Sequence, residues 1–236
     1  MVDTLVEIDI VYRHRSDPNI TSFRRGNVRI SWTRVPLRES SLHVYQSAYS
    51  YCGKTDVPDL LLQAEPVVVL PREYTFEILD WFDHVFTLVD PLVDLDPKFR
   101  KYNHTAYGRG GMGDVAATPE ERLALYPIEG RRNRVCMILG CKTSPVPGEI
   151  YSLREPIARW FHERSSIGMD VYGVPPFEDL PNYLGELPLD TNRAKMAEYR
   201  YAVCFENAHD PFWTAGMFSE RLLHCIESRT VPVYYG

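Results

Sequence analysis

The sequence predicts an α/β protein built from two lobes with a cleft between them. In the second half of the chain, short apolar runs that suit buried strands alternate with segments that suit helices. The first half carries similar apolar runs, and an irregular stretch over residues 90–117 separates the halves. With 236 residues, the chain has the length of one large domain or two small ones. We therefore expect domains at residues 1–117 and 118–236.

Strands dominate the prediction for the first lobe. Residues 5–12 (LVEIDIVY) and 27–35 (NVRISWTRV) alternate apolar and polar side chains, which is the pattern of a half-buried strand. Residues 59–64 (DLLLQA) form a short apolar run typical of a strand buried on both faces, and HVFTLV at 84–89 is a further strand candidate. Between these two runs, apolar residues recur at steps of three and predict a helix over 73–82.

The second lobe alternates more regularly. Thr118 and Glu121 form a capping box that opens a short helix, with Pro119 in its first turn. Such alternation produces a parallel sheet, and ligands of parallel sheets bind at the carboxyl ends of the strands. The expected strands are 135–140, 169–173, 201–207 and 230–236, and the expected helices are 154–164, 191–199 and 218–227.

Composition excludes several classes of protein. Apolar residues make up 44% of the chain and charged residues 25%, which is ordinary for a globular protein. The net charge of −6 argues against a sequence-independent nucleic-acid binder. We expect a cytoplasmic protein without a membrane span, because the sequence has no signal peptide and no run of about 20 apolar residues. The cysteines have no C-x-x-C spacing and are expected to be buried free thiols: Cys52, Cys136, Cys141, Cys204 and Cys225.

Two motifs match functional patterns only in part. Gly108, Gly110 and Gly113 match the dinucleotide-binding pattern by letters, but no clear strand precedes them and no helix follows, so an interdomain loop is favoured. Asp94 and Asp96 resemble an acidic triplet that holds a divalent metal in some glycosyltransferases. Their flanking prolines favour a polar turn instead.

Glu65 follows a buried apolar run directly and precedes a proline. A carboxylate at the end of such a strand suits a general base, because burial raises its pKa toward the working pH. An ionic lock to a nearby arginine explains the position equally well.

The C-terminal segment carries the densest group of candidates. Glu206 and Asn207 end an expected strand, and Ser219, Glu220 and Arg221 open an expected helix. The start of a helix offers unpaired N–H groups and a positive dipole end, which suit a phosphate. Arg221 adds a full charge and Glu220 can accept from a ribose hydroxyl, although an ordinary surface helix also carries such residues.

These motifs resemble the signature of family 10 glycosyltransferases, the α-1,3/1,4-fucosyltransferases. In that family an FEN strand, here residues 205–207, leads to a TEK-type helix and a VP-type strand, here FSERLLHCIESRTVPVYYG at 218–236. Upstream, GEIYSLR at 148–154 resembles the segment with the family's donor-binding arginine. LLLQAEP at 60–66 resembles the segment with its catalytic glutamate. The resemblance covers residues 59–236, and the first 58 positions match weakly.

The resemblance implies a GT-B fold, in which two Rossmann-like lobes face each other across a cleft. It also implies a metal-independent, inverting transfer of L-fucose from GDP-fucose to a hydroxyl of an oligosaccharide or glycoconjugate, with no further cofactor. Glu65 would be the general base that deprotonates the acceptor. The implied donor-binding residues are Arg154, Glu206, Asn207, Ser219, Glu220 and Arg221, and Arg159 remains an alternative to Arg154.

The chain also departs from the family pattern. Arg221 replaces a lysine, Met217 replaces an aromatic residue, and an insertion-like stretch over 210–216 separates FEN from the helix. Family members continue beyond the position that matches Gly236, so the donor lobe is expected to be shortened at its C-terminus. A non-catalytic nucleotide- or glycan-binding relative with an incomplete donor lobe is therefore the alternative hypothesis.

Overall fold

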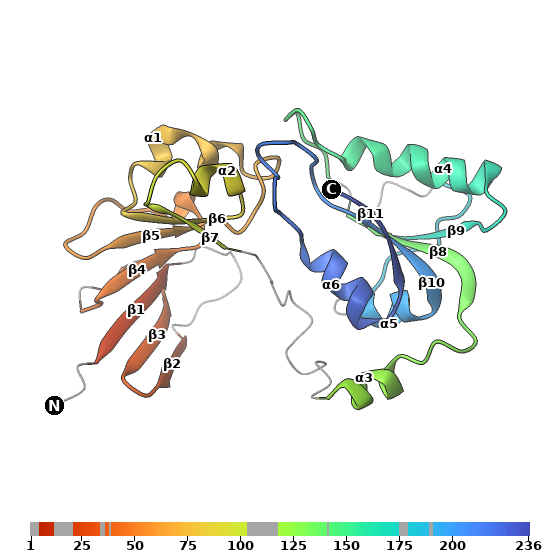
Figure 1. Cartoon of the computed structure of the whole chain (residues 1–236), viewed down its shortest axis with the longest axis horizontal. Helices are drawn as coiled ribbons and strands as arrows, with labels where there is room; N and C mark the ends of the chain where they lie inside the picture. Colours follow the sequence, from red (N-terminus) through yellow and green to blue (C-terminus); the bar gives the residue numbers. More distant parts are fainter. Residues whose placement is uncertain are drawn as a thin grey trace. The chain divides into compact units, whose positions relative to one another are not determined.

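The computed structural model describes residues 5–11, 21–33, 36–37, 39–102, 118–140, 142–174, 179–188 and 191–236. The chain divides into two compact units (Figure 1). Unit 1 comprises Met1–Asn103 together with Pro211–Met217, and unit 2 comprises His104–Asp210 together with Phe218–Gly236. The chain thus leaves unit 2 after Asp210 and returns to it at Phe218, a crossing that the sequence did not predict. The expected boundary at 117/118 borders residues 103–117, which lie outside the described residues.

Unit 1 is organised around a seven-stranded mixed sheet of order β2-β3-β1-β4-β5-β6-β7. Strand β2 pairs antiparallel with β3, and the remaining neighbours pair in parallel. The strands are β1 (Val6–Val11), β2 (Thr21–Arg25), β3 (Val28–Thr33), β4 (Leu42–Tyr45), β5 (Asp59–Leu62), β6 (His84–Thr87) and β7 (Phe99–Lys101). The four strands expected from the periodicity are therefore confirmed as β1, β3, β5 and β6.

The helix expected over 73–82 is shorter in the structure. A 3₁₀-helix, η2 (Pro71–Tyr74), and a single α-turn, α1 (Phe76–Leu79), flank Thr75, whose backbone is extended. The extended residue prevents one continuous helix from forming. Two further short elements complete the helices described for this unit, namely η1 (Ala48–Ser50) and α2 (Asp90–Val93).

Unit 2 contains a four-stranded parallel sheet of order β11-β10-β8-β9. Every element expected in this unit is present, and α4 and β9 have the expected bounds. The strands are β8 (Arg132–Leu139), β9 (Met169–Gly173), β10 (Tyr199–Phe205) and β11 (Val231–Tyr235), and the helical elements are α3 (Pro119–Leu125), η4 (Tyr151–Leu153), α4 (Arg154–Arg164), α5 (Asn192–Ala197) and α6 (Glu220–Glu227).

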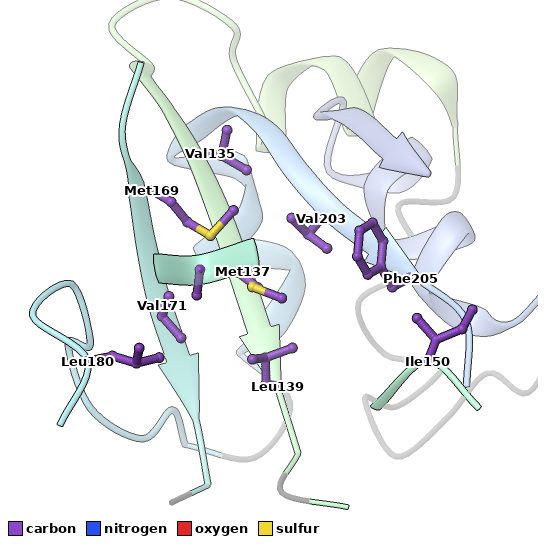
Figure 2. Close-up of a cluster of buried hydrophobic side chains, with 10 residues drawn as sticks. Val135, Met137, Leu139, Ile150, Met169, Val171, Leu180, Val203 and Phe205 are labelled. Carbon is purple, nitrogen blue, oxygen red and sulfur yellow. The ribbon is translucent and has the colours of Figure 1, made fainter. Parts of the chain in front are cut away.

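Side chains that alternate along the strands of unit 2 form two apolar layers. On one face, Val135, Met137 and Leu139 of β8 pack with residues of β9 and β10 and with Ala158 of α4 (Figure 2). On the other face, Cys136 packs with residues of α5 and α6. Because both faces are covered, the ligand-binding edge of this sheet lies at the strand ends.

Two smaller expectations have clear outcomes. The capping box is confirmed, since Thr118 N donates to Glu121 Oε2 at 2.9 Å and Glu121 N donates to Thr118 Oγ1 at 3.2 Å. The expectation of buried cysteines holds for Cys136, Cys204 and Cys225, which are buried free thiols, but it is wrong for Cys52. Cys52 follows η1 and is exposed, whereas the other three belong to the core layers of unit 2. Cys141 lies outside the described residues. No helix among the described residues has the length and apolar composition of a membrane span.

The last residue of β9, Gly173, has to be a glycine because the backbone of β8 leaves no room for a side chain. Its φ is +130°, and an added Cβ would lie 1.8 Å from the Leu139 carbonyl oxygen. We therefore expect Gly173→Ala to lower the free energy of unfolding by more than about 2 kcal/mol in a denaturant titration. Gly140, at the end of β8, has open space around it and serves as the control, for which alanine should change stability by less than about 0.5 kcal/mol. Equal effects of the two substitutions would contradict this account.

Candidate functional site

The strand order of unit 2 creates a switch point. From β8 the chain passes to β9 on one side of it, and later places β10 on the other side. In open α/β sheets, ligands bind in the crevice at the carboxyl ends of the two strands where the order reverses. Here those ends are Gly140 after β8 and Glu206–Asn207 after β10.

Arg154 joins these two strand ends. It is the first residue of α4 and only 4% exposed. Its Nη1 donates to the Gly140 carbonyl at 3.2 Å, and its Nη2 donates to Asn207 Oδ1 at 3.3 Å. The guanidinium carbon lies 4.6 Å from the centroid of the Tyr151 ring, and the ring packs against the guanidinium as a cation–π contact.

No described carboxylate forms a close ion pair with Arg154, and Glu149 offsets its positive charge only through a longer-range interaction. Among the described residues no carboxylate lies within 4.0 Å of its guanidinium, and its Nε has no hydrogen-bond partner. Burial, together with the nearby charge of Arg221, lowers the pKa of Arg154 to about 10. The group still carries its charge at neutral pH. A buried guanidinium with a spare N–H and no close ion-pair partner is suited to an anionic ligand.

The N-terminus of α6 is held next to the end of β10. Ser219 is the N-cap and its hydroxyl accepts from Arg221 N at 3.4 Å. The Glu206 carboxylate is 1% exposed, accepts from Ser219 N at 2.9 Å, and lies 3.9 Å from Arg221 Nη1. Glu206 therefore fixes both the helix start and the Arg221 side chain. Of the predicted donor-site residues, the structure brings together Arg154, Glu206, Asn207, Ser219 and Arg221.

A pocket of about 240 Å³ opens at this edge of the sheet. Arg154, Glu220 and Arg221 line it together with His224, whose pKa is lowered by burial, so that its ring is neutral at pH 7. Apolar side chains such as Leu187 contribute another part of its wall. A combination of cations, hydrogen-bonding groups and apolar surface suits a phosphorylated ligand with a flat ring.

A second pocket, of about 490 Å³, shares Gly140 and Arg154 with the first. Its other lining residues include Lys142, Thr143 and Glu149. Arg154 therefore lines two adjoining pockets. One extended ligand could occupy both while its negatively charged group contacts the Arg154 guanidinium.

Arg159, the alternative to Arg154, has a different environment. Its guanidinium donates to Glu155 Oε1 at 2.9 Å and to Asp179 Oδ2 at 2.5 Å. Two carboxylates thus compensate its charge on the outer surface of α4. Of the two arginines, only Arg154 stands at the switch point with its charge available.

Glu65 lies in unit 1, three residues after β5, and its side chain is exposed. The expectation that it is buried is therefore wrong, because β5 ends at Leu62 and Glu65 lies in a bend beyond the strand. The Glu65 backbone is nevertheless fixed, since its carbonyl accepts from the Tyr74 hydroxyl at 2.7 Å. The buried carboxylate of this region is Glu73, whose pKa is raised by burial and whose Oε1 accepts from Ala48 N at 2.8 Å.

The two partial motifs have simple outcomes. Asp94 and Asp96 are exposed in the turn between α2 and β7, where Asp96 Oδ1 accepts from Lys98 N at 2.7 Å. Within the described ranges, no group of three or more His, Cys, Asp or Glu side chains is arranged to hold a metal ion. Gly108, Gly110 and Gly113 lie outside the described residues.

Several residues of the site were not predicted from the sequence. Gly140 accepts from Arg154, and Tyr151 supports its guanidinium. His224 lies one turn after Glu220 on α6 and faces the same pocket. A glycine directly after an apolar strand and the i, i+4 spacing on α6 were the available signals.

Comparison with known proteins bears on the fold. No protein-family model matches the chain, and no curated protein is similar to it in sequence. Among solved structures, the fold is similar to that of TarM from S. aureus, in a crystal structure of a point mutant in complex with fondaparinux, alpha-GlcNAc-glycerol and UDP. The TM-score is 0.50 and the identity is 9%, covering 84% of this chain and 41% of the TarM chain. The chain thus spans less than half the length of that neighbour, and the similarity concerns the fold alone.

Proposed function

We propose that the protein is a glycosyltransferase that binds a nucleotide sugar at the carboxyl ends of β8 and β10. The observation that carries the proposal is the buried guanidinium of Arg154, which forms no close ion pair with a described carboxylate and joins both strand ends. The UDP and the glycan-type molecules in the TarM structure support this class of ligand for a chain of similar fold. The resemblance of residues 205–207 and 218–236 to the motifs of family 10 glycosyltransferases also supports it.

In this proposal the diphosphate is held by Arg154, Arg221 and the N-terminus of α6. Two guanidinium groups and a helix dipole stabilise the negative charge that develops on the leaving diphosphate. The nucleoside occupies the smaller pocket, where Glu220 accepts from the ribose. The larger pocket beyond Arg154 then receives the sugar.

The transfer step follows from these contacts. Glu65 removes the proton of an acceptor hydroxyl, and the oxygen attacks the anomeric carbon as the bond to the diphosphate breaks. The products are an inverted glycoside and the nucleoside diphosphate, with the proton on Glu65. From the family 10 resemblance, we propose GDP-fucose as the donor, a glycan as the acceptor, and no metal requirement. The GT-B arrangement of the two units is part of the same proposal.

A thermal-shift titration tests the donor site. We expect GDP and GDP-fucose to raise the melting temperature, because a ligand at a hundredfold excess over its Kd adds about 2.7 kcal/mol to the free energy of unfolding. UDP and GDP-mannose show whether the base or the sugar is selected, and a chelator is expected to leave the shift unchanged. The Arg159→Met variant is the control, since its guanidinium is paired with carboxylates and should not contribute.

Each outcome has a defined meaning. A guanosine-selective shift that survives the chelator supports the proposal and justifies a screen of glycan acceptors. A shift that the chelator removes contradicts metal independence. The absence of a shift with every nucleotide contradicts a donor site at Arg154 and favours a protein that binds glycans without transferring them.

A further inference from the structure

The segment Pro211–Met217, here called the strap, packs in unit 1 although both of its flanks belong to unit 2. The Ala215 carbonyl accepts from Asp90 N at 3.2 Å, and the Gly216 carbonyl accepts from Lys101 Nζ at 3.1 Å. Lys101 Nζ also lies 2.6 Å from Asp90 Oδ1. Gly216 has a φ of +74°, and an added Cβ would lie 1.9 Å from Asp90 Oδ2. The end of the strap is therefore closely fitted to α2 and β7.

The middle of the strap reaches the segment that carries Glu65. The Trp213 ring meets the Tyr74 ring edge to face, with 5.9 Å between the centroids and an interplanar angle of 80°. Tyr74 is 5% exposed, and its hydroxyl donates to the Glu65 carbonyl at 2.7 Å. Two contacts in series thus connect the strap with the backbone of the proposed base.

The residues that flank the strap on either side are held within unit 2, and Ser219 on the C-terminal side belongs to the proposed donor site. Before it, His209 N donates to the Gly148 carbonyl at 2.8 Å. After it, the Glu206 carboxylate accepts from Ser219 N at 2.9 Å, which closes the loop at the start of α6. The two ends of the loop over residues 206–219 are therefore close together in unit 2, and its middle part, the strap, packs in unit 1.

We propose that Trp213 and Tyr74 are positioning residues that link occupancy of the donor site to the placement of Glu65. The inference rests on the proposed function, because it assumes that a nucleotide binds at the start of α6. Binding there restrains Ser219 and Arg221, and the strap transmits this restraint through Trp213 and Tyr74 to the Glu65 backbone. A general base must be held in place when the acceptor reacts, since small misplacements are costly in rate.

Amide hydrogen exchange with saturating GDP tests this link without requiring a known acceptor. In the unmodified protein we expect GDP to slow exchange at residues 219–221, in the strap, and at residues 65–74. In Trp213→Ala the protection at 219–221 should remain, while the protection at 65–74 disappears. Trp213→Phe keeps an aromatic ring, so this variant should show the GDP-induced protection at 65–74. Trp160→Ala, at an exposed tryptophan of α4, is the control and should leave both regions as they were.

Tyr74→Phe removes only the hydroxyl and so separates the two contacts. The strap should still be protected by GDP, whereas protection close to Glu65 should be lost. In turnover of GDP-fucose, measured as GDP release, kcat should fall about tenfold while the KM for the donor is unchanged. Two results would overturn the inference. One is GDP-induced protection at 65–74 that persists in Trp213→Ala. The other is an unmodified protein in which GDP protects α6 but not residues 65–74. Absence of protection at α6 itself would instead contradict the proposed function.

Discussion

Replacing Arg154 by methionine is expected to weaken nucleotide binding by about 10- to 100-fold and, at the same time, to stabilise the free protein. The first effect follows because hydrogen bonds to a charged group contribute roughly 1.5–3 kcal/mol, and the diphosphate loses its central cation. The second follows because the charged form of Arg154 is disfavoured in the folded state. A pKa lowered to about 10 corresponds to roughly 3 kcal/mol of cost to the charge.

Methionine fills a similar volume without a charge, so part of this cost is recovered. The contacts to Gly140, Asn207 and Tyr151 are lost, and we expect a net gain in the free energy of unfolding of about 1–2 kcal/mol. Denaturant titration gives the stability, and a GDP titration gives the affinity. Arg159→Met should alter neither by much, since that side chain is half-exposed and paired on the surface. A variant that is both less stable and fully able to bind GDP would show that Arg154 is structural.

Glu65→Gln is expected to retain donor binding and to lose transfer by a factor of about 10²–10⁴, the usual contribution of a general base. Glutamine keeps the shape of the side chain but cannot take the acceptor proton. The Glu65 backbone carbonyl, which holds Tyr74, is unchanged by the substitution. The loss should therefore appear in kcat, with the GDP-induced thermal shift preserved.

Two matched variants sharpen this test. Glu77→Gln, at an exposed glutamate of α1, should behave as the unmodified protein. Glu73→Gln examines the buried carboxylate of the same region, which is the remaining candidate if Glu65→Gln turns over normally. Normal turnover of Glu65→Gln would assign Glu65 a structural role and remove it from the proposed mechanism.

The sequence predicted unit 2 more completely than unit 1, for a physical reason. Strands β8, β9 and β10 are buried on both faces and joined by helices, so their apolar runs are long and clearly bounded. The same regularity places Arg154 at the start of α4 and Ser219 at the start of α6, where they were expected. The clustering of these residues followed from parallel topology, which brings the carboxyl ends of strands to one edge.

The prediction of unit 1 was incomplete, because several of its elements are short. Strands β2, β4 and β7 and helix α2 have three to five residues, too few for a periodic pattern to stand out from the flanking loops. The exposure of Glu65 could not be predicted either, because it depends on the turn that follows Gln63 rather than on the apolar run before it. The strap was recognised as an insertion, but its docking depends on contacts with residues more than a hundred positions away.

The strap also constrains the order in which the chain can fold during synthesis. Pro211–Met217 completes the surface around Tyr74, Asp90 and Lys101, yet it is made after most of unit 2. Unit 1 therefore cannot reach its final packing as an N-terminal domain that folds first on the ribosome. Its last contacts form only after Met217 has emerged, and a fragment that ends before Pro211 leaves the Tyr74 ring without the indole that packs against it.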